Sequence, residues 1–348
     1  MIAAPMERPA AFACPPVADC VPAQARPVTV IGRGLMTLNM RGCLLAAALS
    51  SPLLAQAVEP VQCELIRFAD VGWTDITVTT AVTRQVLSDL GYRTQVKRLS
   101  VPDTYQAMQD GKIDVFLGNW MPSMENDIKP YAANGSVKTL GANLTGAKYT
   151  LAVNQAAHEG GVKNFADLAR FSKEMGGKLY GIESGNDGNK LIQSMIDKNA
   201  FGLQDFSLVE SSENGMLAQV KRAEHLKQWV VFLGWAPHPM NNQLQMHYLD
   251  GGDEFFGPDY GGATVYTNVR AGLAEQCPNV TQLLKNLRFS LEMESYLMGA
   301  ILNKNTNPRR EAKAWLKANP QALASWLHGV TRRDGLPPKA AASLAAND

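Results

Sequence analysis

This chain contains the run VFLGNWMP at residues 115–122 and a near-duplicate, VFLGWAP, at residues 231–237. Each run opens with apolar residues typical of a buried strand and then reaches glycine, tryptophan and proline. A third run, VGWTD at residues 71–75, places another tryptophan two residues before an aspartate, just after a short apolar stretch. The three runs predict strands that each lead to a tryptophan, and the pairing of Trp73 with Asp75 suits a cation.

The hydrophobic pattern around these runs alternates between strand and helix. In the first part we expect strands at 65–69, 94–99 and 113–117, with helices at 76–90 and 103–110. The alternation resumes with strands at 149–153, 179–182, 207–210, 229–233 and 263–268, and helices at 164–173, 189–198 and 215–222. The chain then ends in helices at 280–288, 291–302, 308–318 and 320–328. Because parallel strands need crossover connections, this order predicts an α/β fold whose mainly parallel sheets are covered by helices.

The composition of the 348-residue chain is that of a soluble globular protein, with 46% hydrophobic and 19% charged residues. The length is enough for two ordinary domains. The formal net charge is +1 and the charges are not gathered in blocks, so nothing indicates a nucleic acid or a polyanionic surface as a partner. The ligand must therefore be inferred from a site.

Residues 1–57 are predicted to be an export signal rather than part of the fold. Arg41 precedes an apolar run at 43–54, and residues 55–57 (AQA) match a small-x-small cleavage site. The apolar run is shorter than the roughly 20 residues that a membrane-spanning helix needs. We expect cleavage near Ala57 and a soluble periplasmic protein. Residues 1–35 lack periodicity and precede Met36, so we interpret them as an extension from a misassigned start.

Export leaves Cys63 and Cys277 in an oxidising compartment, which favours a disulfide; two buried free thiols are the alternative. A bond between them would bring the start of the mature chain next to a late segment. It would assign residues 58–145 and 263–348 to one lobe and residues 146–262 to a second. The chain would then cross twice between the lobes, as in hinged proteins that close on a ligand.

Candidate binding residues gather at one predicted edge of the sheets. In open α/β sheets, ligands lie beyond the carboxyl ends of the strands. Trp73, Trp120, Asn186 and Trp235 all follow such ends. Tyr149 begins its predicted strand, but it lies beside the crossover and can also face the cleft.

Each of these residues also has a structural interpretation. A tryptophan after an apolar strand often belongs to the core, and Asn186 in a glycine-rich turn is a turn former. Asp75 or Thr74 could cap the helix that we expect to begin at Ile76. The convergence of the candidates on one edge favours a binding site over these separate explanations.

Three tryptophans and a tyrosine around a small volume would form an aromatic box. The negative ring faces attract a quaternary ammonium group, and each well-placed face contributes about 0.5–2 kcal/mol when desolvated. An ammonium with free N–H groups would leave those donors unpaired in such a box. The box therefore favours a methylated amine.

From about residue 62 to residue 330 the sequence resembles the substrate-binding proteins of glycine betaine/proline betaine/choline ABC transporters, and most closely the choline-binding members. These are two-lobed type II periplasmic binding proteins. The residues that carry the resemblance are the runs VGWTD (71–75), GNWMP (118–122), KY (148–149), GNDG (185–188) and GWAPH (234–238). The segment before Met36 departs from the family pattern.

The resemblance implies a role for each candidate residue. A trimethylammonium group would be caged by Trp73, Trp120, Tyr149 and Trp235, and the hydroxyl of choline would be held by Asp75 and Asn186. It also implies the Cys63–Cys277 disulfide, and a membrane permease of an ABC importer as the partner.

The acidic residue favours an alcohol over a carboxylate as the second ligand group. A betaine carboxylate would lie next to the carboxylate of Asp75 and be repelled by it. The choline hydroxyl can instead donate a hydrogen bond to Asp75, and the negative charge of Asp75 attracts the choline cation. We therefore expect high-affinity periplasmic binding of choline, with acetylcholine as a weaker ligand, for delivery to the permease. We expect a monomer that uses no cofactor and no metal, and that binds no nucleic acid.

Three other functions stay open. The protein could bind glycine betaine or another quaternary amine, process choline esters as an enzyme, or serve as a sensor module with the same site. An enzyme would need a nucleophile and a base, yet the sequence lacks the Gly-x-Ser-x-Gly, His-Glu-x-x-His, phosphate-loop and dinucleotide motifs. His238 is close enough to Trp235 to reach the cleft, where a supporting role is favoured over catalysis.

Overall fold

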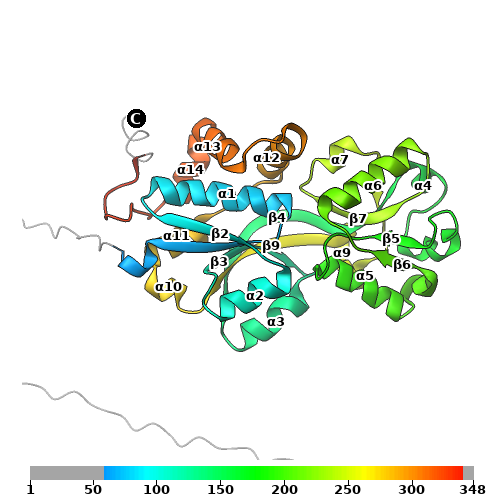
Figure 1. Ribbon diagram of the computed structural model, residues 1–348, viewed down its shortest axis with the longest axis horizontal. Helices are drawn as coiled ribbons and strands as arrows, with labels where there is room; N and C mark the ends of the chain where they lie inside the picture. Colours follow the sequence, from blue (N-terminus) through cyan, green and yellow to red (C-terminus); the bar gives the residue numbers. More distant parts are fainter. Residues whose placement is uncertain (1–58, 340–348) are drawn as a thin grey trace, which may run out of the picture. The chain divides into compact units, whose positions relative to one another are not determined.

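The computed structural model describes residues 59–339. The predicted export signal and its cleavage site near Ala57 lie outside the described residues. Between residues 59 and 339 the chain forms one nine-stranded mixed sheet with helices on both faces (Figure 1). The strands are β1 (Leu65–Asp70), β2 (Arg93–Arg98), β3 (Val115–Met121), β4 (Val137–Asn154), β5 (Lys178–Tyr180), β6 (Ser207–Val209), β7 (Val231–Ala236), β8 (Met246–Tyr248) and β9 (Gly262–Arg270).

The helices largely follow the predicted alternation. The α-helices are α1 (Thr74–Asp89), α2 (Val101–Gln109), α3 (Glu125–Ala133), α4 (Gln155–Glu159), α5 (Asp187–Asp197), α6 (Glu213–His225), α7 (Met240–Gln243), α8 (Asp253–Phe256), α9 (Pro258–Gly261), α10 (Leu273–Gln276), α11 (Pro278–Asn286), α12 (Leu291–Lys304), α13 (Pro308–Ala318) and α14 (Pro320–Trp326). Short 3-10 helices are η1 (Val61–Cys63), η2 (Phe165–Asp167), η3 (Ala169–Phe171) and η4 (Ala200–Asp205). None of the helices within residues 59–339 combines the length and the apolar character needed to cross a membrane.

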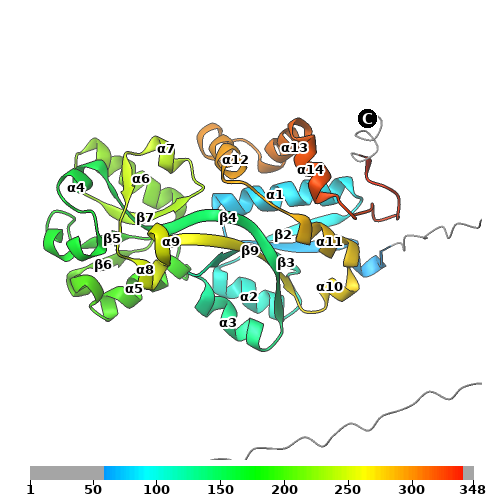
Figure 2. The same ribbon diagram turned by 180° about the vertical axis from the view of Figure 1, so that it is seen from behind.

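The sheet contains two groups of parallel strands joined by two antiparallel ones. β1 pairs in parallel with β2 and β3, and β5 pairs in parallel with β6 and β7. β9 extends the first group through β3, and β4 extends the second through β7. β4 and β9 pair with each other between the groups, so the sheet continues from one lobe into the other (Figure 2). β8 pairs with β4.

This two-lobed α/β arrangement, with two strands crossing between the lobes, confirms the predicted fold class. We call lobe I the part around β1–β3 and lobe II the part around β5–β7. The predicted divisions at 145/146 and 262/263 fall within β4 and at the first residues of β9. They stay predictions.

Two predicted elements differ from the observed ones. The helix expected at 164–173 is wrong: η2 and η3 replace it, and Phe165 and Leu168, three residues apart, are both fully buried, as suits the three-residue turn of a 3-10 helix. The strand expected at 149–153 is only the end of β4, which has 18 residues. Irregular pairing with β9 between Thr139 and Ala147 interrupts the two-residue periodicity that would have revealed its first half.

Helix α1 is almost entirely buried despite its many threonines, because it packs against α12 and α13 as well as the sheet (Figure 1). Two of its buried hydroxyls bond within the helix: Thr79 Oγ1 donates to the carbonyl of Asp75 at 3.0 Å, and Thr83 Oγ1 donates to that of Thr79 at 2.8 Å. These bonds let a sequence of weak helix formers lie in the core. They also hold the first turn, which carries Asp75.

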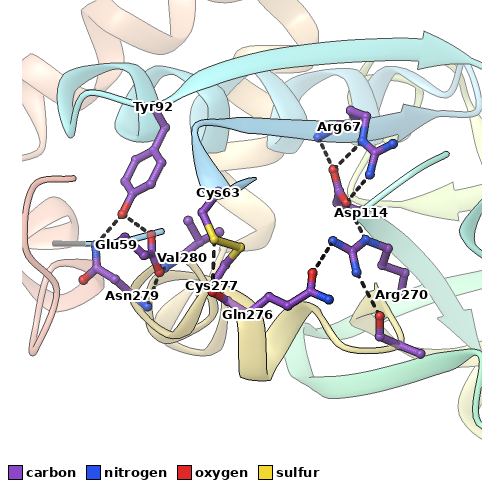
Figure 3. Close-up of a disulfide and its surroundings, with 11 residues drawn as sticks. Glu59, Cys63, Arg67, Tyr92, Asp114, Arg270, Gln276, Cys277, Asn279 and Val280 are labelled. Carbon is purple, nitrogen blue, oxygen red and sulfur yellow. Dashed lines mark hydrogen bonds and ion pairs between the residues drawn. A yellow bond between two sulfur atoms is a disulfide. The ribbon is translucent and has the colours of Figure 1, made fainter. Parts of the chain in front are cut away.

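The predicted disulfide is present: Cys63 and Cys277 are bonded across 214 residues of sequence (Figure 3). Next to it, Glu59 accepts hydrogen bonds from the backbone N–H groups of Asn279 at 2.6 Å and Val280 at 3.2 Å, at the start of α11. The first described residue of the chain is therefore tied to the same late segment as the disulfide.

Candidate cation-binding site

One buried cavity collects most of the predicted site residues. The empty space between its walls is about 260 Å³, part of it open to solvent. Its walls are formed by Trp73, Asp75, Trp120, Tyr149, Ile182, Asp187 and Trp235. Five of the six predicted ligand-binding residues are thus together, and Asn186 lies next to the lining residue Asp187.

Trp73 and Asp75 are positioned by the tight connection from β1 to α1. Gly72 has a φ of +97°, a backbone conformation that residues with a Cβ rarely adopt. Asp70 stabilises this turn, because its carboxylate accepts hydrogen bonds from the N–H of Gly72 at 2.7 Å and from Thr77 Oγ1 at 2.8 Å. Trp73 is consequently the last residue before the helix and is 6% exposed.

The duplicated runs place two further aromatic walls. Trp120 lies in β3 and Trp235 lies in β7, so both are within their strands rather than after them as predicted. Tyr149 is paired with Trp235 in the β4–β7 ladder, and their ring centroids are 6.5 Å apart at 76°. Trp120 and Tyr149 are 6.0 Å apart at 57°. Neither pair is stacked, so the rings are inclined to one another rather than face to face.

Asp75 brings a partly unsatisfied carboxylate to the cavity. The side chain is 1% exposed, and Oδ2 accepts a hydrogen bond from Trp120 Nε1 at 3.2 Å. Oδ1 has no hydrogen-bond partner among the described residues. Burial raises the pKa of Asp75 to about 8, and the nearby charge of Glu213 adds to the rise. Helix α1 begins at Thr74, so neither Thr74 nor Asp75 is its N-cap, contrary to the alternative interpretation.

A second carboxylate, Asp187, was missed by the sequence reasoning. It is the first residue of α5 and is 1% exposed. Oδ1 accepts from Asn186 Nδ2 at 3.1 Å, whereas Oδ2 has no partner among residues 59–339. Burial raises the pKa of Asp187 to about 7. The only signal in the sequence was its place beside Asn186 in the glycine-rich turn.

Asn186 organises the wall formed by lobe II. Its Oδ1 caps α5 by accepting from the N–H of Asn189 at 3.1 Å, and it also accepts from the hydroxyl of Tyr149 at 2.9 Å. Tyr149 packs closely against this helix start, because a Cβ on Gly188 would lie 2.1 Å from the tyrosine hydroxyl. The turn-forming role of Asn186 is therefore observed, and its contact with a ligand stays a prediction.

Further acidic residues surround the cavity, and its described lining includes neither lysine nor arginine. Glu183 accepts from Trp73 Nε1 at 2.6 Å, and burial raises the pKa of Glu183. Glu294 on α12 is 2% exposed; burial, together with the charge of Asp75, raises its pKa well above the ordinary value. A cation entering this region would relieve the mutual repulsion of the carboxylates.

Comparison with known proteins agrees with this geometry. Residues 64–318 match the family described as the substrate-binding domain of the ABC-type glycine betaine transport system, OpuAC. The chain belongs to the OpuAC family. Members of this family bind substrates for transport.

Two solved structures are similar to this OpuAC-family chain. An ABC-transporter choline-binding protein in complex with choline is 56% identical, with a TM-score of 0.80 over 83% of this chain and 100% of that chain. An ABC-transporter choline-binding protein in an unliganded, semi-closed conformation is 57% identical, with a TM-score of 0.75 over 82% of this chain and 99% of that one. The glycine betaine/carnitine transport binding protein GbuC of Listeria monocytogenes is 30% identical over 157 residues, which are 45% of this chain and 51% of GbuC.

In this OpuAC-family protein, His238 supports the cavity wall from behind. Its ring lies 4.8 Å from that of Trp235. Nδ1 accepts from the N–H of Met240 at 2.9 Å, which places the ring proton on Nε2, and Nε2 lies 3.1 Å from Glu213 Oε1. Both ring nitrogens are therefore engaged in holding the fold.

Proposed function

We propose that this protein binds choline in the periplasm and delivers it to the membrane permease of an ABC importer. One observation carries the proposal: three tryptophans, one tyrosine and two carboxylates line a single small buried cavity. The chain is also 56% identical to a protein whose structure contains choline.

The trimethylammonium group would occupy the aromatic part of the cavity. It has no N–H groups to satisfy, so it gains from ring faces and from burial of its methyl groups. Trp73 and Trp120 come from lobe I, whereas Trp235 comes from lobe II and Tyr149 from the crossing strand β4. A ligand held by both lobes favours the closed state only by its extra affinity for that state.

The hydroxyl of choline would lie at the polar part of the cavity. It can donate to Asp75 Oδ1, which has no partner within residues 59–339. Its oxygen can accept from the amide of Asn186, which among these residues donates one hydrogen bond, to Asp187. Asp187 then contributes negative charge from the other lobe.

A zwitterion would be disfavoured in the same place. The carboxylate of glycine betaine would lie near Asp75 and Asp187 with no described lysine or arginine in the lining to balance it. Choline carries only the positive charge. We therefore infer the order choline, then acetylcholine, then glycine betaine.

The enzyme alternative is disfavoured by the hydrogen bonds of His238. A general base in a triad accepts a proton from the nucleophile and is oriented by an acid. Here Thr74 Oγ1 donates to Glu213 Oε1 at 2.6 Å, and His238 contacts the same carboxylate oxygen. The histidine therefore does not lie between the hydroxyl and the acid, and we propose a binding protein without catalytic activity.

The proposal is tested by titrating the purified mature protein with choline, acetylcholine and glycine betaine. Tryptophan fluorescence and calorimetry should give the tightest binding for choline and the weakest for glycine betaine. Equal affinity for choline and glycine betaine would contradict the assignment. Magnetic resonance of each ligand after long incubation should show no conversion, and hydrolysis of acetylcholine would favour an enzyme. Gel filtration with light scattering tests the expected monomer.

A further inference from the structure

Helix α1 begins next to the cation site without a cap from its own segment. Its N-cap residue, Trp73, makes no side-chain capping hydrogen bond. The first N–H groups of a helix need acceptors from outside the helix. Glu213 supplies one: Oε2 accepts from the N–H of Thr74 at 2.8 Å, and Oε1 accepts from Thr74 Oγ1 at 2.6 Å.

The cap comes from the other lobe. Thr74 follows β1 in lobe I, whereas Glu213 is the first residue of α6 and lies between β6 and β7 in lobe II. The two residues are 139 positions apart in sequence, and their hydrogen bonds are buried. The carboxylate therefore lies at the N-termini of two helices, α1 and α6, where the helix dipoles favour a negative charge.

Glu213 is itself held in place on the lobe II side. His238 Nε2 lies 3.1 Å from Oε1, and the histidine is fixed in turn by the N–H of Met240 at 2.9 Å. The carboxylate thus has three donors, two from Thr74 and one from His238. This arrangement orients the carboxylate toward α1.

Thr74 lies between two residues of the proposed choline site. Trp73 precedes it and Asp75 follows it, so a cap on Thr74 restrains the backbone of both. Trp73 has a second restraint from lobe II, because its indole N–H donates to Glu183 Oε1 at 2.6 Å. Only when the lobes meet are these contacts possible.

We propose that Glu213 is a positioning residue that couples closure of the two lobes to assembly of the choline site, by capping α1 from the opposite lobe. Glu213 would not need to touch the ligand. The inference rests on the proposed function for the identity of the ligand, and on the hydrogen bonds alone for the coupling. Because the cap stabilises the closed state, from which the ligand has to leave, its loss should act on dissociation rather than on association.

The kinetic test compares Glu213→Gln, Thr74→Val and the double variant with the wild type, using stopped-flow tryptophan fluorescence with choline. Glutamine cannot accept from all three donors and lacks the charge, so we expect dissociation about 10- to 100-fold faster, the range for bonds to a charged group. The association rate should stay within about threefold. The double variant should dissociate within about twofold of Glu213→Gln, since the Thr74 hydroxyl donates to Glu213 and its removal adds little once the carboxylate is gone. Asn214→Ala, at the exposed neighbouring position of α6, is the matched control and should behave as the wild type.

A second measurement does not depend on the ligand. Hydrogen exchange of the peptide covering residues 71–80, in the absence of choline, should be faster in Glu213→Gln than in the wild type, while Asn214→Ala leaves it unchanged. Unchanged exchange and unchanged dissociation in Glu213→Gln would overturn the coupling. Slower association together with a lower melting temperature would also overturn it, because that pattern marks a general loss of folding. Failure of the wild type to bind choline would refute the proposed function, while the exchange measurement would still decide the role of Glu213.

Discussion

Trp120 donates its indole N–H to Asp75 Oδ2 at 3.2 Å, inside the buried cavity. One side chain offers an aromatic face and the other a carboxylate, and the hydrogen bond fixes their relative position. It also leaves Oδ1 of Asp75 without a partner among the described residues. The cation-attracting groups of lobe I are therefore a connected unit, and the following predictions test its parts.

Replacing Asp75 with asparagine should change selectivity. The Asp75→Asn substitution would keep the shape of the side chain but remove the negative charge that attracts a cation and repels a carboxylate. We expect choline affinity to fall about 10- to 100-fold, the range for losing a hydrogen bond to a charged group, with glycine betaine affected much less. Calorimetry with both ligands measures the ratio. An equal loss for the two ligands would show that Asp75 does not discriminate between them.

Choline affinity should increase with pH between about 6 and 8. The raised pKa of Asp75, about 8, means that the ligand-free site is mainly protonated at neutral pH. A bound cation favours the ionised form and lowers this pKa, so binding releases a proton and is favoured as protons become scarcer. Calorimetry in buffers of different ionisation enthalpy measures the released proton. Asp75→Asn should release fewer protons, and a pH-independent affinity in the wild type would contradict the prediction.

Asp187→Asn should weaken choline binding and improve the relative binding of glycine betaine. Its Oδ2 has no partner within the described chain and its carboxylate lies in the cavity wall. Removing a nearby negative charge should cost the cation about three- to tenfold in affinity if the local dielectric is that of a partly solvated site. Competition titrations with both ligands provide the measurement. A change confined to thermal stability would assign Asp187 a purely structural role.

Trp120→Phe and Trp120→Leu separate two contributions of one side chain. Phenylalanine retains a ring face but loses the hydrogen bond to Asp75, whereas leucine loses both. We expect the leucine variant to bind choline more weakly than the phenylalanine variant by about three- to thirtyfold, the value of one desolvated cation–π contact. Trp315→Phe is the control, because Trp315 packs against Trp326 rather than in the cavity. Equal affinities for the two Trp120 variants would argue against a role for the ring face.

Removing the disulfide should lower stability more than affinity. A closed loop of about 214 residues contributes at most about 5 kcal/mol in the chain-entropy model, and about 2–5 kcal/mol is commonly lost. Cys63 lies just before the first residue of β1, whereas Trp73 and Asp75 follow the last residue of β1. The disulfide is therefore not directly attached to the cavity walls. Denaturant unfolding of the Cys63→Ser/Cys277→Ser variant should show the loss, with choline affinity within about twofold. A large loss of choline affinity in a variant that is still folded would contradict the prediction that the disulfide acts on stability and not on binding.

Much of lobe I was predictable because its elements are signalled locally. The apolar run before Trp120 and the helical spacing from Ile76 onward need no distant partner to be recognised. The sequence predicted only the end of β4, because the first half of this strand pairs irregularly with β9. The helix expected from Asn164 is replaced by 3-10 turns. In both places the pattern depends on contacts with segments that are distant in sequence.

By itself the sequence determined the aromatic and acidic character of the site, since three Trp-containing runs, a tyrosine and Asp75 suffice to indicate a methylated cation. The tertiary structure alone decided that Asp187 joins the cavity wall, and that Glu213 rather than Thr74 or Asp75 caps α1. The physical reason is that burial and capping partners depend on which segments meet in space. A hydrogen bond between residues 139 positions apart produces no periodic pattern in the sequence from which it could be predicted.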